Sequence, residues 1–113
     1  MGWQRLCSAH EVAIGRLTSV EIQGVKVLVT RVGSDFFALP PLCPHMAEPL
    51  EISGVCADGM LTCTKHIWQW DLRSGEPRGE AEKPLLRYPT RLQEGDVWID
   101  FDHELTYDPT IEV

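Results

Sequence analysis

Two short segments of the chain carry side chains that commonly bind metals. They are Cys43-Pro44-His45 and Cys63-Thr64-Lys65-His66, and 17 residues separate the first histidine from the second cysteine. Thiolates suit iron–sulfur clusters, Cu(I) and zinc, whereas imidazole suits the borderline metals. If the two segments are tips of facing hairpin loops, the cysteines meet at one depth and the histidines at another. That arrangement fits a cluster of two metal ions better than a single ion.

Two simpler interpretations of these four residues stay open. Cys43 and Cys63 could be buried thiols that have nothing to do with His45 and His66. Alternatively, the same four side chains could bind one zinc ion, because zinc accepts thiolate and imidazole ligands. Cys7 and Cys56 lie outside the pattern: we expect Cys7 to be a small buried hydrophobe and Cys56, in a turn-rich stretch, to be exposed and oxidisable.

The segments around these residues are typical of β-strands, with short β-branched and aromatic runs between turn signals. Strands are expected over Leu17–Ile22, Val25–Arg31, Phe36–Leu39, Met60–Thr64, Ile67–Leu72, Leu85–Leu92 and Val97–Phe101. Turns are expected at Gln23-Gly24, at Gly33-Ser34-Asp35 and at Glu94-Gly95-Asp96. One short helix is expected over Ala9–Ile14, after Ser8 as its cap. Short strands at this spacing predict an all-β barrel or sandwich.

Length and charge limit the classes of function. The chain has 113 residues and a net charge of −7, so we expect one domain and no nucleic-acid partner, because phosphate binding needs a basic surface. We also expect no membrane segment, no secretory signal and a cytoplasmic location. The charge is uneven, since the last 20 residues hold seven acidic side chains and no lysine or arginine. This acidic end is either a solvated surface or a steering surface for a basic partner.

The four-residue pattern resembles that of the Rieske [2Fe–2S] proteins, in which two histidines replace two cysteines on one iron. The resemblance extends over about residues 3–101, including Pro84-Leu85-Leu86-Arg87-Tyr88-Pro89 and the strand Val97–Phe101. It implies a Rieske fold, with an antiparallel β-sandwich or barrel base and a small cluster-binding subdomain of two ligand loops. We expect a single domain over 1–113, the subdomain over about 41–75 and an acidic tail over 102–113. One cluster per chain is implied, with Cys43 and Cys63 on the inner iron and His45 and His66 on the outer iron.

The resemblance also implies a function. Within the family, His66-Ile67-Trp68-Gln69-Trp70 is most similar to the ferredoxin components of bacterial soluble diiron monooxygenases, which oxidise toluene, alkenes or isoprene. The chain is then no enzyme but a monomeric one-electron carrier from an NAD(P)H-dependent flavin/iron–sulfur reductase to a diiron hydroxylase. Three alternatives remain: a ferredoxin of a ring-hydroxylating dioxygenase, a small subunit of nitrite reductase, and a zinc-stabilised binding module.

Departures from the pattern of respiratory Rieske proteins predict a low potential. Glu48 and Lys65 stand where those proteins have two cysteines that form a disulfide. Trp68 and Trp70 stand where those proteins place a serine and a tyrosine hydroxyl on cluster and cysteine sulfur. Fewer hydrogen-bond donors to the sulfurs lower the potential, so we expect a value of about −150 mV, at the bottom of the Rieske range.

Four residues near the ligands are candidates for partner docking or cluster shielding: Met46, Ile67, Trp68 and Pro84. We expect Trp68 and Trp70 to face opposite sides of their strand. One should pack in the core, and the other, for which we favour Trp68, should shield the cluster or form part of a docking surface.

Overall fold

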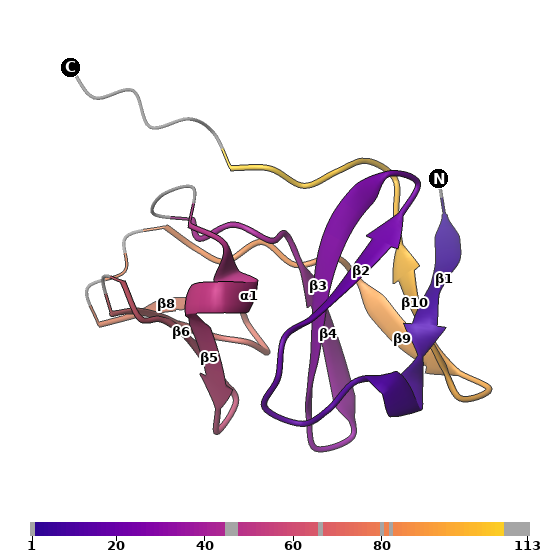
Figure 1. Cartoon of the computed structure of the whole chain (residues 1–113), viewed down its shortest axis with the longest axis horizontal. Helices are drawn as coiled ribbons and strands as arrows, with labels where there is room; N and C mark the ends of the chain where they lie inside the picture. Colours follow the sequence, from indigo (N-terminus) through magenta and orange to yellow (C-terminus); the bar gives the residue numbers. More distant parts are fainter. Residues whose placement is uncertain (1, 45–47, 66, 80, 82, 108–113) are drawn as a thin grey trace.

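Antiparallel strands make up most of the regular structure of the chain (Figure 1). The computed structural model describes residues 2–44, 48–65, 67–79, 81 and 83–107. The strands are β1 (Trp3–Ser8), β2 (Thr18–Ile22), β3 (Val25–Val32), β4 (Asp35–Leu39), β5 (Gly54–Ala57), β6 (Met60–Cys63), β7 (Trp68–Asp71), β8 (Pro77–Arg78), β9 (Thr90–Gln93) and β10 (Asp96–Asp100). One turn of 3-10 helix, η1 (Ala9–Glu11), and one of α-helix, α1 (Leu50–Ser53), complete the elements. The all-β expectation is confirmed.

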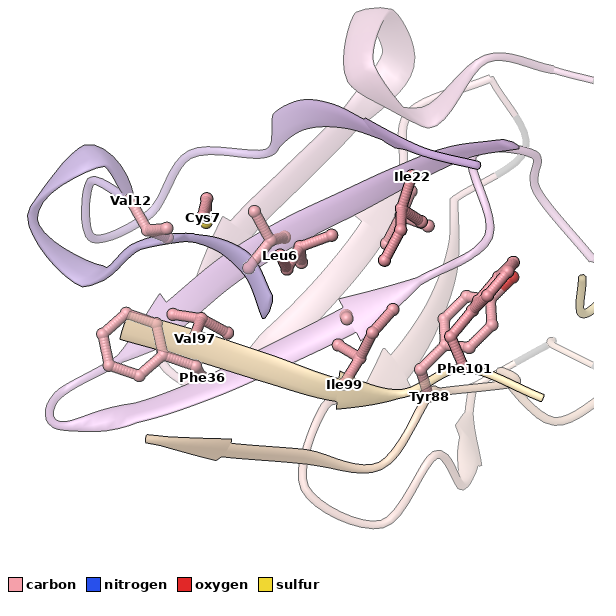
Figure 2. Packing of buried hydrophobic residues seen from close by; sticks show 12 residues of the cluster. Leu6, Cys7, Val12, Ile22, Phe36, Tyr88, Val97, Ile99 and Phe101 are labelled. Carbon is pink, nitrogen blue, oxygen red and sulfur yellow. The ribbon is translucent and has the colours of Figure 1, made fainter. Parts of the chain in front are cut away.

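Two three-stranded sheets form the base of the molecule. Their strand orders are β1-β10-β9 and β2-β3-β4. The side chains that pack between them form one apolar cluster, which includes Leu6, Val27, Ile99 and Phe101 (Figure 2). A bridge between Ala38 and Tyr88 links the two sheets further.

A four-stranded sheet, in the order β5-β6-β7-β8, lies on the other side of β3 and β4. The strand β3 serves both halves, because successive side chains of a strand point to opposite faces. Val27 and Val29 belong to the cluster of the base, whereas Leu28 belongs to a second cluster beneath the four-stranded sheet. This double burial explains why the centre of β3, residues 27–29, is apolar at three successive positions and does not alternate with polar residues.

The hairpin turns follow the chemistry that the sequence predicted at Gln23-Gly24 and Glu94-Gly95. Both residues of each pair have positive φ, as a two-residue turn between twisted strands requires. Asp58-Gly59 makes the same kind of turn between β5 and β6. Three tight turns of this kind fix the register of the strands that they join.

Several element predictions were wrong for local reasons. The helix over Ala9–Ile14 is only the single turn η1, because the Ala9 N–H bonds the carbonyl of Gly95 and continues the pairing of β1 with β10. The strand β1 was missed because its register shifts between Arg5 and Cys7, a bulge that buries Leu6 and Cys7 together and breaks the alternation. The long strand over 85–92 shortens to β9, since Pro89 lacks the N–H that a ladder needs.

Among the described residues, none forms a helix with the length and apolar content of a bilayer-spanning segment. The division of the chain into a base, a subdomain over about 41–75 and an acidic tail stays a prediction.

Candidate metal centre

Backbone hydrogen bonds hold the first of the two predicted ligand loops, which follows β4. The Cys43 N–H donates to the carbonyl of Glu48 at 3.0 Å, and the Leu50 N–H donates to the carbonyl of Pro41 at 2.8 Å. These two bonds bring the ends of the loop together, so Cys43 is held in place and is only 2% exposed. His45 and Met46 of the predicted set lie outside the described residues.

The second ligand loop begins at the last residue of β6. Cys63 pairs with Gly54 on β5 and with Trp68 on β7, and its side chain is fully buried. Gly54 is needed there, because a Cβ at this position would stand 2.5 Å from the carbonyl oxygen of Leu50. The Ile67 N–H donates to the carbonyl of Cys63 at 2.8 Å and closes the loop. His66 lies outside the described residues.

A buried serine joins the two loops. Ser53, at the end of α1, accepts two hydrogen bonds at its carbonyl oxygen, from the N–H of Thr64 and from the hydroxyl of Thr64. Its own hydroxyl donates to the carboxylate of Glu48. Ser53 is one of the few buried polar side chains of the described part of the chain. No pattern in the sequence indicates this role, because α1 has only four residues and leaves no helical periodicity.

The structure brings the two cysteines of the pattern into one apolar cluster. Cys43 and Cys63 pack there with Leu28, Leu50 and Leu61, and neither thiol is in a disulfide. Within the described residues no three His, Cys, Asp or Glu side chains gather around one point, but both histidines of the pattern lie outside them. The structure therefore places both cysteines in one buried cluster, and both histidines of the pattern lie outside the described residues.

Comparison with known proteins decides the family. The family model described as "Rieske [2Fe-2S] domain" matches residues 2–89. The chain belongs to the Rieske [2Fe–2S] family. The cluster of this family is therefore its cofactor, and two buried, unbridged thiols fit the sulfur ligands that such a cluster needs. When bound, the cluster supplies one-electron redox chemistry.

Relatives of this Rieske chain include ferredoxins of several oxygenase systems. The methanesulfonate monooxygenase ferredoxin subunit of Methylosulfonomonas methylovora is 48% identical over 108 residues, which cover 96% of this chain and 88% of the relative. The biphenyl dioxygenase ferredoxin subunit of a Pseudomonas species is 29% identical, over 89% and 94% of the two chains. The alkene monooxygenase ferredoxin component of Xanthobacter autotrophicus is 26% identical, over 83% and 77%.

Solved structures agree with the Rieske fold. The Sphingomonas yanoikuyae B1 ferredoxin aligns with a TM-score of 0.76 at 25% identity, over 86% of this chain and 96% of that chain. The ferredoxin of carbazole 1,9a-dioxygenase from Nocardioides aromaticivorans aligns with a TM-score of 0.75 at 24% identity, over 88% and 97%. The expected Rieske fold, built mostly of antiparallel strands, is confirmed.

The two tryptophans of β7 share one face of the strand, so the expectation of opposite faces was wrong. Residues two apart on a strand point the same way, and Trp68 and Trp70 are both buried, with ring centroids 6.1 Å apart. Trp68 can therefore shield the cluster site but is no docking surface. The Trp70 indole N–H donates to the carbonyl of Lys83 at 2.8 Å and holds the exposed Pro84 beside β7.

The remaining cysteines are buried in the apolar clusters. Cys7 is 5% exposed, as predicted, and burial, followed by the charge of Glu11, raises its thiol pKa to about 11. Cys56 is 8% exposed and burial raises its pKa too, so the expectation of an exposed, oxidisable thiol was wrong. Cys56 lies on the face of β5 that packs against the apolar cluster beneath the four-stranded sheet, so its side chain is buried.

Two tyrosine hydroxyls tie the C-terminal segment to residues 84–89. The Leu105 N–H donates to the Tyr88 hydroxyl, and the Leu86 N–H donates to the Tyr107 hydroxyl, each at 2.9 Å. In Figure 1 this segment runs from β10 back toward the half of the molecule that holds the ligand loops. Burial, with a smaller contribution from Cys43, raises the pKa of Tyr107. Residues 102–107 are exposed or half-buried, and these two bonds attach the segment to the rest of the molecule.

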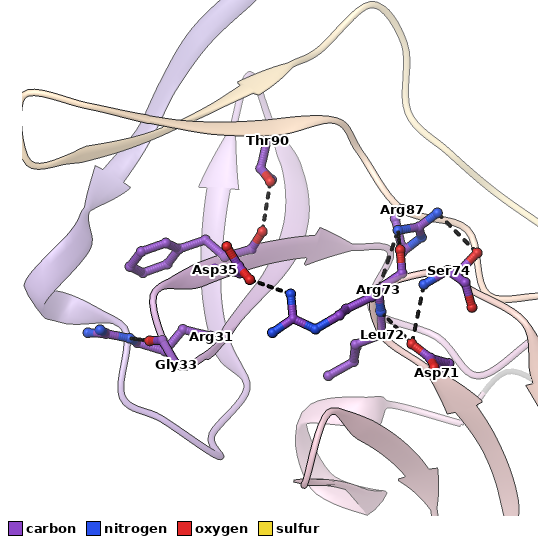
Figure 3. Close-up of polar contacts among 10 residues, drawn as sticks. Arg31, Gly33, Asp35, Asp71, Leu72, Arg73, Ser74, Arg87 and Thr90 are labelled. Atoms are coloured by element: carbon purple, nitrogen blue, oxygen red, sulfur yellow. Dashed lines mark hydrogen bonds and ion pairs between the residues drawn. The ribbon is translucent and has the colours of Figure 1, made fainter.

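Polar contacts stiffen the turn between β7 and β8 (Figure 3). The Arg87 guanidinium donates to three carbonyls of this turn, those of Leu72, Arg73 and Ser74. Arg73 in turn forms an ion pair with Asp35 at the start of β4. This ion pair joins the turn of the four-stranded sheet to β4 of the base.

Proposed function

We propose that this Rieske protein is the ferredoxin of an oxygenase system and carries single electrons from an NAD(P)H-dependent flavin/iron–sulfur reductase to the oxygenase component. Cys43, His45, Cys63 and His66 hold the cluster in this proposal. Support comes from the two buried thiols in one apolar cluster and from ferredoxin relatives that span almost the whole chain.

The proposed acceptor is the oxygenase of a monooxygenase system that acts on a small alkylsulfonate. The single observation that carries this choice is the 48% identity to the methanesulfonate monooxygenase ferredoxin subunit, against 29% and 26% for the biphenyl dioxygenase and alkene monooxygenase ferredoxins. The expected diiron hydroxylase, as in alkene oxidation, stays a prediction with weaker support from these identities. A ring-hydroxylating dioxygenase is the second candidate, because several relatives serve dioxygenases.

The edge of the molecule beside the ligand loops is the proposed contact with both redox partners. Electron transfer needs a close approach to the cluster, and such encounters are transient and bury less than about 1,200 Å². The exposed side chain of Ile67 directly follows His66 in the sequence. The exposed Pro84 follows Lys83, whose carbonyl accepts the hydrogen bond from the Trp70 indole on β7. In this proposal, the oxygenase and the reductase recognise a few exposed side chains around the cluster, including Ile67 and Pro84.

Reconstitution with purified components tests the acceptor. The ferredoxin, a matched reductase and NAD(P)H are combined with one of three oxygenases, those of methanesulfonate monooxygenase, alkene monooxygenase and biphenyl dioxygenase. We expect the highest rate of product formation, coupled to NAD(P)H oxidation, with the methanesulfonate oxygenase. A higher coupled rate with the alkene or biphenyl enzyme would reassign the acceptor, and no coupled turnover with any of them would refute the proposal. Omitting the ferredoxin supplies the control.

A further inference from the structure

Ile67 has a backbone conformation that isoleucine rarely adopts. Four non-glycine residues of the described chain have positive φ, and three of them, Gln23, Asp58 and Glu94, precede a glycine in a hairpin turn. Ile67, with φ of 59°, is the β-branched member of the four and is followed by Trp68 instead. A β-branched side chain in this region is a genuine outlier, because its branched Cβ crowds the backbone.

The fold explains the positive φ but not the isoleucine. The bond from the Ile67 N–H to the Cys63 carbonyl closes one helical turn, and β7 starts in the next residue. A left-handed residue at the end of such a turn redirects the chain, and glycine or asparagine takes that conformation with little conflict. The loop therefore needs a left-handed residue here, and any gain from isoleucine must come from its side chain.

Packing against the described residues does not supply that gain. The side chain is 63% exposed, and it belongs to neither apolar cluster of the described residues. A single exposed apolar side chain is ordinary on a protein surface. One that also strains the backbone, beside a ligand loop, indicates a contact outside the chain.

We propose that Ile67 is an apolar contact that the oxygenase component covers when it accepts the electron, and that it helps to select the oxygenase. This inference rests on the proposed function, in which the partner approaches the edge beside His66. The oxygenase is the favoured occupant because the related ferredoxins are named for different oxygenases and one structural relative is a complex of an oxygenase with its ferredoxin. In a small transient interface, one desolvated apolar side chain supplies a large share of the affinity.

Three variants of the holoprotein test the proposal. Ile67→Asn tolerates the left-handed backbone but removes the apolar surface, whereas Ile67→Leu keeps that surface. Leu92→Asn is the matched control, because Leu92 is exposed and apolar (53%) but lies on β9 in the other half of the molecule. Each variant is measured for the ferredoxin concentration that half-saturates the oxygenase, for the saturating rate, and for reduction by the reductase alone. Cluster content, midpoint potential and thermal midpoint are measured in parallel.

For Ile67→Asn we expect the half-saturating ferredoxin concentration to rise at least about fivefold. This is the loss of binding affinity expected when part of one apolar side chain is no longer buried by the partner. The saturating rate, potential and cluster content stay unchanged, and the thermal midpoint stays equal or rises because strain is relieved. Ile67→Leu and Leu92→Asn stay within about twofold of the wild type in half-saturation.

Three results would overturn the proposal. Ile67→Asn could leave the half-saturating concentration unchanged, or it could lose the cluster, which would make the role of Ile67 structural. An effect confined to reduction by the reductase would identify that protein as the occupant instead. If the wild-type protein supports no oxygenase, the proposed function fails as well; if the wild type works and Ile67→Asn matches it, only this inference fails.

Discussion

Ser53 and Thr64 are joined by two hydrogen bonds, from the Thr64 N–H at 2.9 Å and from the Thr64 hydroxyl at 2.8 Å, both to the Ser53 carbonyl oxygen. The Ser53 hydroxyl donates a hydrogen bond to the carboxylate of Glu48, in the first predicted ligand loop. One buried serine thus connects the loop that follows Cys43 to the residue that follows Cys63. The resemblance places the disulfide cysteines of respiratory Rieske proteins at the positions of Glu48 and Lys65, and here hydrogen bonds through Ser53 link the two segments.

Removing the Ser53 hydroxyl should loosen the first ligand loop. Ser53→Ala deletes a hydrogen bond to a carboxylate and leaves Glu48 without that donor, so we expect a loss of about 1.5–3 kcal/mol in the free energy of unfolding. Cluster absorbance in the visible range should also decay faster on incubation in air. Ser19→Ala, at an exposed position of β2, is the matched control. Equal stability and equal cluster lifetime in the two variants would contradict the role of Ser53.

The midpoint potential should lie near the low end of the Rieske range, at about −150 mV. Trp70 stands where respiratory proteins have a tyrosine hydroxyl, and its single N–H donates to the carbonyl of Lys83, so it is not available to a cluster sulfur. A spectroelectrochemical titration measures this value directly. A midpoint of about +200 mV or above would show that donors to the sulfurs are more numerous than inferred.

The thiol of Cys7 should react slowly with iodoacetamide. With its pKa raised to about 11 by burial, roughly one molecule in a thousand carries the thiolate at pH 8. The same shift makes stability depend on pH, because the unfolded thiol, with a pKa of about 9, loses its proton first. This contribution to stability is complete below pH 9 and falls as the pH rises from about 9 to 11. Peptide mapping after alkylation of the holoprotein and of the unfolded protein gives the comparison, and equal labelling of Cys7 in both would refute its burial.

The tyrosine bonds to the C-terminal segment should be measurable at single amides. Tyr107→Phe removes the acceptor of the Leu86 N–H, which should lower the free energy of unfolding by about 1–2 kcal/mol. Hydrogen exchange of the Leu86 amide should become faster. The Asp100 amide, which donates to the carbonyl of Pro89, is the internal control and should keep its protection. Unchanged exchange at Leu86 would show that the Tyr107 hydroxyl is not its partner in solution.

The metal-binding pattern and most hairpins could be predicted from sequence because both are local signals. Cys43 and Cys63 are marked by their spacing to the histidines, and Gln23-Gly24 is marked by the φ values that its turn requires. The parts that were missed depend on contacts remote in sequence. The bulge at Cys7 hides β1 from a period-two pattern, and the role of Ser53 appears only when α1 lies against both ligand loops. Cys56 was misjudged because its turn-rich neighbours do not indicate which face of β5 is covered.

The most direct test of the central claim is the iron and acid-labile sulfide content of the purified chain, together with the EPR spectrum of its reduced form. A Rieske ferredoxin should hold about two irons and two sulfides per chain and should show a Rieske-type signal after uptake of one electron. Replacing either His45 or His66 by cysteine should change that signal, because one of the two nitrogen ligands of the outer iron would be replaced by sulfur. A colourless protein that holds zinc, or a cluster without nitrogen ligands, would contradict the account.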